Sequence, residues 1–265
     1  MKRKITERLI EWKNRPNHKP LILQGARQVG KSYILEEFGR NHYKNYVSVS
    51  LDLVTDLQNF LKENINPLEI IAYLESLFNT RILPHETLVI LDEIQDCKRA
   101  LLALKYFQEE YPQYDIVAAG SLLGVAVNKG VKEDDDNTSN LNREIEDEFS
   151  YPVGKVDELT LYPMDFEEFC WALNEKPLIP YIRTCFEKRM PLERSLHDKA
   201  MLLFKQYLLV GGMPKAVAEF LNRQKNFGAA DAEKRDILAL YRGDIMKIQA
   251  QYRAKVLAIF DQIPG

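Results

Sequence analysis

Apolar and polar residues follow two different periods along the chain up to residue 162. Short apolar or alternating runs, typical of strands, occur at 20–24, 46–51, 88–91, 115–120 and 156–161. Between them, apolar residues recur every three or four positions, as on the buried face of a helix, at 6–12, 31–40, 67–78 and 98–110. This alternation predicts an α/β fold in which helices sandwich a five-stranded parallel sheet, with any ligand at the carboxyl ends of the strands.

Beyond Pro163 the pattern becomes entirely helical. Asp165 and Glu168 have the spacing of a capping box, which predicts a helix over 166–173. Further helices are expected at 195–210, ended by Gly211 and Gly212, from Pro214 onward, and over 235–260. We therefore expect two domains, an α/β domain over 1–162 and a small helical domain over 163–265.

The composition is that of a soluble globular protein. The chain has 265 residues, of which 46% are hydrophobic and 28% charged, enough to bury a large core. No apolar run is long enough to span a bilayer, and the first seven residues lack the apolar core of a secretory signal, so we expect a cytoplasmic protein without a membrane partner. Three widely spaced cysteines, Cys97, Cys170 and Cys185, match neither a disulfide framework nor a metal site.

The net charge of −3 is distributed unevenly. Between residues 125 and 150, eight acidic and three basic side chains give −5, so the rest of the chain carries about +2. Such a polar, acidic stretch cannot bury enough surface to order itself, and we expect a flexible loop over 129–148, with a regulatory role as the less favoured alternative. The remaining positive charge is too small to indicate nucleic-acid binding.

Residues 25–32 read Gly-Ala-Arg-Gln-Val-Gly-Lys-Ser, between a strand and a helix. Glycines let the backbone turn so that N–H groups face phosphate oxygens at the helix start, a lysine at this position reaches the β- and γ-phosphates, and a serine hydroxyl suits Mg²⁺. A chance glycine turn is the alternative, which the flanking strand and helix disfavour. We expect ATP and Mg²⁺ as cofactors, and the candidate ATP-binding residues are Gly25, Ala26, Arg27, Gln28, Val29, Gly30, Lys31, Ser32 and Tyr33.

Two carboxylates end the apolar run at 88–91. Asp92 is the natural second ligand for Mg²⁺, alongside Ser32. Glu93 projects differently and is suited to polarise the water that attacks the γ-phosphate, as a general base. Acidic pairs also occur as solvated strand ends, but the phosphate loop favours the catalytic interpretation.

The run at 115–120 is followed by Ser121. In P-loop ATPases with a comparable acidic pair, a polar residue at this strand end often senses the γ-phosphate, and a serine that caps the next turn is an almost equal alternative. The candidate catalytic residues are therefore Glu93, Lys31 and Ser121, and the candidate metal ligands are Ser32 and Asp92.

Several motifs together resemble one family, the predicted prokaryotic ATPases of the AAA+ type that carry a C-terminal domain of unknown function. The resemblance lies in six stretches that cover nearly the whole chain: 21–32, 91–95 (Leu-Asp-Glu-Ile-Gln), 119–124, 151–155, 161–169 and 211–214 (Gly-Gly-Met-Pro). It implies that 1–162 is an AAA+ nucleotide-binding P-loop domain for ATP and Mg²⁺, and that the helical region includes a winged-helix-like part.

The chain departs from this family in two ways. Many relatives have Gly-Arg where this chain has Gly154 and Lys155. This puts a phosphate-sensor role for Lys155 in doubt, because a lysine offers phosphate a single point charge whereas an arginine can donate two parallel hydrogen bonds. Relatives also continue further, so we expect the helical domain to be truncated at its C-terminal end.

The expected function is that of an ATP hydrolase that couples its nucleotide state to a conformational change. The alternative is a slowly hydrolysing switch or a DNA- or protein-binding module that acts through the helical region. Many AAA+ proteins are oligomers that complete the site with an arginine from a neighbouring subunit. Arg143, Arg183 and Arg189 are candidates for that role, and none is assigned.

Overall fold

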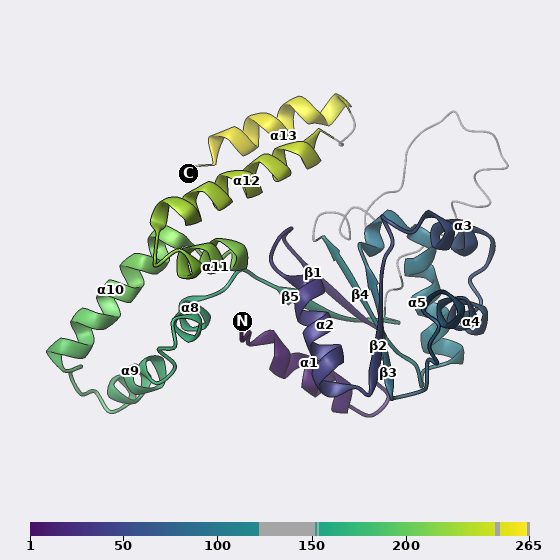
Figure 1. The fold of residues 1–265 in the computed structure, drawn as a ribbon, viewed down its shortest axis with the longest axis horizontal. Helices are drawn as coiled ribbons and strands as arrows, with labels where there is room; N and C mark the ends of the chain where they lie inside the picture. Colours follow the sequence, from purple (N-terminus) through teal and green to yellow (C-terminus); the bar gives the residue numbers. More distant parts are fainter. Residues whose placement is uncertain (122–151, 153, 247–249, 264–265) are drawn as a thin grey trace. The chain divides into compact units, whose positions relative to one another are not determined.

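The computed structural model describes residues 1–121, 152, 154–246 and 250–263 of the chain. The chain divides into two compact units, Lys4–Tyr162, here the sheet unit, and Met1–Arg3 with Pro163–Gly265, here the helical unit (Figure 1). The acidic segment 129–148 and Arg143 lie outside the described residues. Within the part of the chain that is described, no helix is long and apolar enough to cross a bilayer.

The sheet unit contains a five-stranded sheet in which every paired strand is parallel, as the hydrophobic pattern predicts. Its strand order is β2-β3-β4-β1-β5. The strands are β1 (Leu21–Gly25), β2 (Asn45–Ser50), β3 (Thr87–Asp92), β4 (Asp115–Ser121) and β5 (Asp157–Leu161). Gly25 at the end of β1 is in register with Ser121 on one side and Leu161 on the other, so these three strands end together.

Helices cover both faces of this sheet, as Figure 1 shows. Along β3, Leu88 and Ile90 face one apolar cluster while Val89 and Leu91 face the other, because successive strand residues point to opposite faces. The first cluster is completed by α1 (Ile5–Asn14) and α2 (Lys31–His42), and the second by α3 (Thr55–Glu63), α4 (Pro67–Phe78) and α5 (Lys98–Glu110).

The helical unit consists of α8 (Phe166–Ala172), α9 (Leu178–Glu187), α10 (Arg194–Val210), α11 (Pro214–Asn222), α12 (Phe227–Ile245) and α13 (Ala250–Gln262). Its main apolar cluster is built around Phe169, Val217 and Phe220, which are fully buried. The capping box is present, since the Asp165 side chain accepts from the Glu168 N–H and the Glu168 side chain accepts from the Asp165 N–H.

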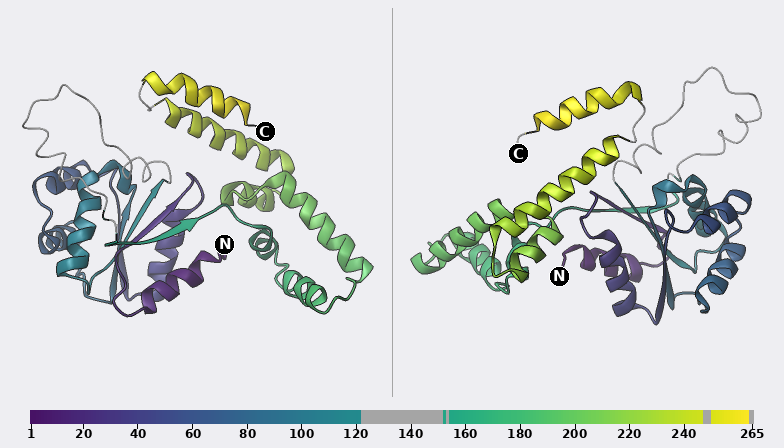
Figure 2. Two further views of the ribbon diagram at one scale, coloured as in Figure 1. Left: turned by 180° about the vertical axis from the view of Figure 1, so that it is seen from behind. Right: turned by 45° about the horizontal axis from the view of Figure 1, so that its top comes forward.

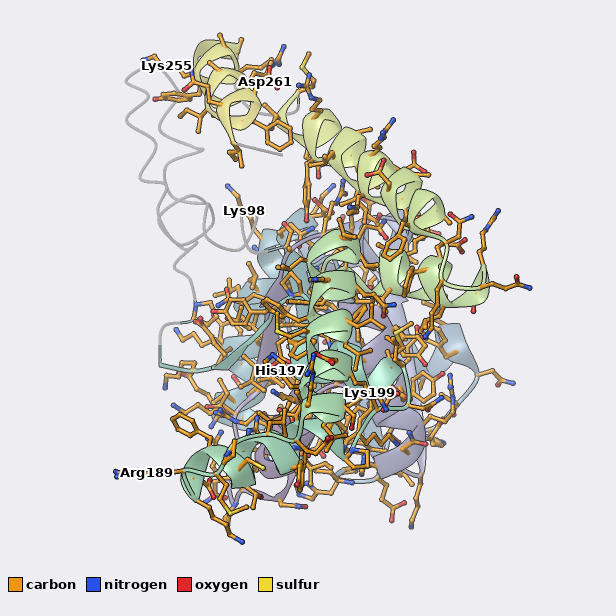
Figure 3. The ribbon with its side chains drawn as sticks, turned by 90° about the vertical axis from the view of Figure 1, so that its left-hand side faces the viewer. Lys98, Arg189, His197, Lys199, Lys255 and Asp261 are labelled. Atoms are coloured by element: carbon orange, nitrogen blue, oxygen red, sulfur yellow. The ribbon has the colours of Figure 1, made fainter. Side chains whose placement is uncertain are left out.

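The last two helices, α12 and α13, contact each other; they lie close together in Figure 1 and in the left view of Figure 2, and in the right view of Figure 2 they diverge toward the C-terminus. An ion pair between Arg242 of α12 and Asp261 of α13 joins them, and Figure 3 labels Asp261. On α10, Lys199 forms an ion pair of 2.6 Å with Glu175, which lies between α8 and α9. These surface pairs contribute little to stability, because both partners are partly solvated.

Two elements differ from the sequence prediction. The helix expected over 235–260 begins earlier, at Phe227, where the Asn226 side chain accepts from the Ala229 N–H at 3.1 Å, and α13 is a separate helix. Helices α3 and α9 were not predicted. In α9 the proline at position 180 lies in the first turn, where a missing N–H costs no intrahelical hydrogen bond.

The Gly-Gly-Met-Pro turn packs directly on the segment before α8. The Met164 N–H donates to the Gly212 carbonyl at 2.7 Å, and the Tyr207 hydroxyl donates to the Met164 carbonyl at 3.0 Å. A Cβ atom on Gly212 would lie 2.2 Å from the Met164 oxygen, so only glycine fits. Two of the motifs that carry the family resemblance are therefore one packing unit.

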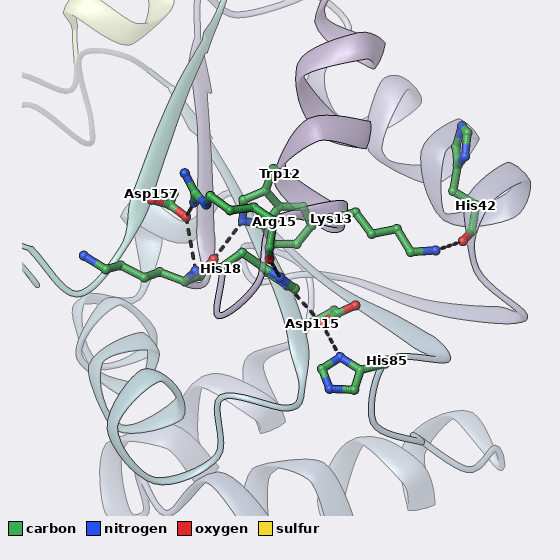
Figure 4. A network of polar contacts seen from close by, with 9 residues as sticks. Trp12, Lys13, Arg15, His18, His42, His85, Asp115 and Asp157 are labelled. Carbon is green, nitrogen blue, oxygen red and sulfur yellow. Dashed lines mark hydrogen bonds and ion pairs between the residues drawn. The ribbon is translucent and has the colours of Figure 1, made fainter.

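A polar network fixes the amino-terminal edge of the sheet, as Figure 4 shows. Arg15 forms an ion pair with Asp157 at the start of β5. Both His18 Nε2 and His85 Nδ1 lie near the same oxygen of the buried Asp115, at 3.1 and 3.4 Å. The strands β1, β4 and β5 thus start from a common, hydrogen-bonded edge, and their carboxyl ends converge at the opposite edge.

Candidate active site

The segment between β1 and α2 forms a tight loop with two residues in the left-handed backbone region. Gln28 has φ 64° and Gly30 has φ 92°. Gly30 is also the N-cap of α2, where it supplies no side chain and its carbonyl accepts from the Ile34 N–H at 3.1 Å. The first N–H groups of α2 have no partner within the helix, so the loop and the positive end of the helix together suit an anion.

Gly25 is required where the loop leaves β1. A Cβ atom at this position would lie 2.4 Å from the Leu161 carbonyl oxygen and 3.2 Å from Val29 Cγ1. The first glycine of the loop is therefore required by the close approach of β5.

Lys31 is the first residue of α2 and its side chain returns into the loop. The side chain is buried, and Nζ donates to the carbonyls of Gly25 at 3.2 Å and Ala26 at 3.1 Å. Burial lowers the pKa of Lys31, while the nearby carboxylates of Glu93 and Asp92 act in the opposite direction. The ammonium group is thus fixed within electrostatic range of the acidic pair.

Ser32 and Asp92 meet across 60 residues of sequence. The Ser32 hydroxyl donates to the Asp92 carboxylate, which also accepts from the Glu93 N–H at 2.9 Å. A hydroxyl and a carboxylate oxygen side by side are the hard ligands that Mg²⁺ prefers.

Mg²⁺ in such sites is held by few protein groups. In the described residues, no group of three or more His, Cys, Asp or Glu side chains is arranged to hold a metal ion. Magnesium sites on nucleotide phosphates use one or two protein oxygens, and water and phosphate fill the remaining positions. The Ser32 hydroxyl and the Asp92 carboxylate therefore fit a magnesium ion.

Glu93 and Ser121 are joined by a residue that the sequence prediction missed. Glu93 has φ 52°, which turns the chain sharply after β3 into the short 3₁₀-helix η1 (Ile94–Asp96). The Gln95 amide donates from Nε2 to Glu93 Oε2 at 2.5 Å, and Gln95 Oε1 accepts from the Ser121 N–H at 3.2 Å. The signal was present in the Asp-Glu-Ile-Gln run, but the run alone does not reveal the partner 26 residues away.

The other loop candidates differ in where their side chains lie. Val29 is fully buried and packs in the apolar cluster of α1 and α2, as Ala26 does in part. Tyr33 is 56% exposed on the first turn of α2, and Arg27 is half-buried with its charge within range of Lys31. Among these four residues, only Arg27 places a charged side chain near Lys31.

Lys155 does not belong to this site. It precedes β5, whose first residue Asp157 is in register with Leu21 at the start of β1, so Lys155 lies at the opposite edge of the sheet from Gly25. Its Nζ forms an ion pair of 2.8 Å with Glu109 near the end of α5. Of the candidate arginines, Arg183 forms an ion pair of 2.6 Å with Glu167.

The chain is similar to known proteins both in sequence and in fold. Residues 17–134 match the family model described as "AAA domain". That segment contains the phosphate loop, the acidic pair and Ser121. No curated protein matches the chain.

Several solved structures are similar to the chain at low identity. The Walker-type ATPase paby2304 of Pyrococcus abyssi has 18% identity and a TM-score of 0.46, with 96% of this chain and 76% of that one covered. AMPPCP-bound DnaA from Aquifex aeolicus has 14% identity and a TM-score of 0.38, with 92% and 66% covered. Unliganded Pif1 from Bacteroides sp has 17% identity and a TM-score of 0.35, and this chain spans 45% of it.

Proposed function

We propose, from the premise that residues 17–134 belong to the AAA-domain family of P-loop ATPases, that this chain binds ATP with Mg²⁺ and hydrolyses it. One observation carries the proposal. Lys31, Ser32, Asp92 and Glu93 come from two non-adjacent strand ends and meet at one edge of the sheet. That edge is where ligands bind in open α/β sheets.

Each of these side chains has a task that its position supports. The Lys31 ammonium contacts phosphate oxygens by exchanging its hydrogen bonds with the loop carbonyls. Ser32 and Asp92 would hold Mg²⁺, which supplies charge neutralisation on the phosphate oxygens when it is bound. Glu93 accepts a proton from the attacking water as the general base.

A conformational change can reach the helical unit along the chain itself. The phosphate loop begins at Gly25, whose backbone abuts the carbonyl of Leu161, the last residue of β5. Two residues later the chain enters the helical unit at Pro163. A shift of the loop on phosphate binding or release therefore acts on the segment that carries α8.

Replacing Glu93 tests the hydrolytic role. Glu93→Gln keeps the shape of the side chain and removes its basicity, so we expect ATP affinity to stay unchanged. We expect kcat to fall by a factor of about 100 or more, because a general base typically accelerates a reaction by at least that factor. Glu110→Gln, the same change at an exposed residue that ends α5, is the matched control and should leave kcat unchanged. Phosphate release by Glu93→Gln at the wild-type rate would remove Glu93 from this role.

A slowly hydrolysing switch that docks a protein partner is the second candidate. The observation that favours it lies on α10, where Met201, Leu202, Leu208 and Leu209 are between 41% and 65% exposed. Turnover measured over a range of protein concentrations separates the two candidates. A rate per chain that rises with concentration supports an oligomeric ATPase, and at most one turnover per chain at every concentration supports the switch.

A further inference from the structure

Gln95 connects two strand ends of the candidate site through one side chain. Its Nε2 donates to Glu93 Oε2 at 2.5 Å and approaches Asp96 Oδ2 at 3.4 Å, while its Oε1 accepts from the Ser121 N–H at 3.2 Å. A primary amide offers a hydrogen-bond donor and an acceptor in one rigid plane. The bridge therefore uses both ends of the amide.

The backbone that carries Gln95 is held firmly. Ile94, the residue before it, is fully buried in the apolar cluster of α3, α4 and α5. The Cys97 N–H donates to the Ile94 carbonyl at 3.2 Å, and the Asp96 N–H donates to the Glu93 carbonyl at 3.0 Å. The amide thus extends from a fixed point rather than from a mobile loop.

The hydrogen bond from Gln95 restrains the position of the Glu93 carboxylate. Its backbone is fixed by the left-handed turn and by the hydrogen bond of its N–H to Asp92. Its carboxylate, however, is carried on three rotatable bonds and is only half-buried. A general base must lie within hydrogen-bond reach of the water that it deprotonates, so an unrestrained carboxylate would be out of position much of the time.

Ser121 links the same amide to the phosphate loop. It is the last residue of β4 and is in register with Gly25, where the loop begins. Through Ser121, the Gln95 amide is thus connected to the strand that pairs with β1 at the start of the phosphate loop.

We propose that Gln95 is a positioning residue, which orients the Glu93 carboxylate and couples its orientation to the end of β4 beside the phosphate loop. This inference rests on the proposed hydrolysis of ATP. In this proposal Gln95 acts through Glu93 and does not contact the substrate.

Two substitutions separate the two halves of the bridge. Gln95→Glu can still accept from the Ser121 N–H but cannot donate to Glu93, and it places a like charge beside it. Gln95→Leu removes both bonds at similar volume. We expect kcat to fall about 10-fold to 100-fold in both variants, the effect of a misplaced reacting group, while KM for ATP stays within about twofold. Gln113→Glu, the same change before the start of β4, is the control and should leave kcat unchanged.

Amide hydrogen exchange of Ser121, measured by NMR on the protein without nucleotide, tests the bridge independently of turnover. Gln95→Leu should raise the exchange rate about fivefold to tenfold, the effect of one lost hydrogen bond, and Gln95→Glu should leave it unchanged. A wild-type kcat in Gln95→Glu, or Ser121 exchange unaffected in Gln95→Leu, would overturn the inference. If the wild-type protein releases no phosphate, the proposed function fails, and the exchange measurement still decides whether the bridge exists.

Discussion

Lys31 carries a charge in a place that disfavours it. Burial lowers the pKa of its ammonium group, and a lysine whose pKa is lower in the folded than in the unfolded protein costs folding free energy wherever it is charged in both states. This cost is present below the folded-state pKa and disappears as the pH rises through the unfolded value of 10.5. We interpret this unfavourable buried charge as a group that binds an anion.

The stability of Lys31→Met tests this interpretation. Methionine fills the same space without a charge, so the relief of desolvation opposes the loss of two hydrogen bonds to the loop carbonyls. We expect the free energy of unfolding, measured with urea in the absence of nucleotide, to change by less than about 1 kcal/mol. Lys62→Met, at an exposed position of α3, is the control. A loss of several kcal/mol in Lys31→Met alone would give the lysine a structural role instead.

The candidate site residues could be proposed from the sequence where they lie in a local motif, as in the phosphate loop and the acidic pair, or directly follow an apolar strand, as Ser121 does. The phosphate loop and the acidic pair are recognisable from the spacing of their residues, and each residue type suits the binding of phosphate or Mg²⁺. The direction of a side chain requires the fold, which is why Val29 and Tyr33 looked equivalent in the sequence although one is buried and the other exposed. The contact between Gln95 and Ser121 depends on the pairing of β3 with β4, which no local pattern encodes.

At the scale of elements, hydrophobic periodicity located the five strands and the flanking helices α1, α2, α4 and α5. Helix α5 has the predicted bounds, because its apolar positions repeat over three turns and turn residues flank them. Helix α3 was missed because its buried face is reduced to Leu57 and Leu61, too few positions to define a period. The order of the strands was not predicted, since it is decided by which edges pair.

Gly212→Ala tests the packing unit of the Gly-Gly-Met-Pro turn. The added Cβ would overlap the Met164 carbonyl, and we expect the free energy of unfolding to fall by about 2 kcal/mol. The chain has two tryptophans, and Trp171 lies in the helical unit, so its fluorescence in a Trp12→Phe background reports this unit.

Gly243→Ala is the matched control in the same unit. Gly243 lies within α12 with open space around its Cα, so alanine should stabilise the helix by about 0.5 to 1 kcal/mol. Equal effects of the two substitutions would contradict the close approach at Gly212.

At the scale of the whole molecule, the two units are joined by the chain at both ends of the sheet unit. Arg3 forms a buried ion pair of 3.1 Å with Glu168, and Met1 packs against the apolar cluster of the helical unit, so α1 begins directly after residues that belong to that unit. The second connection follows β5. An ion pair between residues so far apart in sequence could not be predicted from local patterns.

The central claim is that the sheet unit binds Mg-ATP through Lys31. Its most direct test is the melting temperature of that unit, followed through the fluorescence of the buried Trp12 in a Trp171→Phe background, with and without Mg-ATP. At a hundred times the dissociation constant, ATP should stabilise the unit by about 2.7 kcal/mol, which raises its melting temperature by about 5 to 11 °C. Lys31→Met should show no such rise. Wild-type protein that melts at the same temperature with and without Mg-ATP, or an equal rise in Lys31→Met, would contradict the claim.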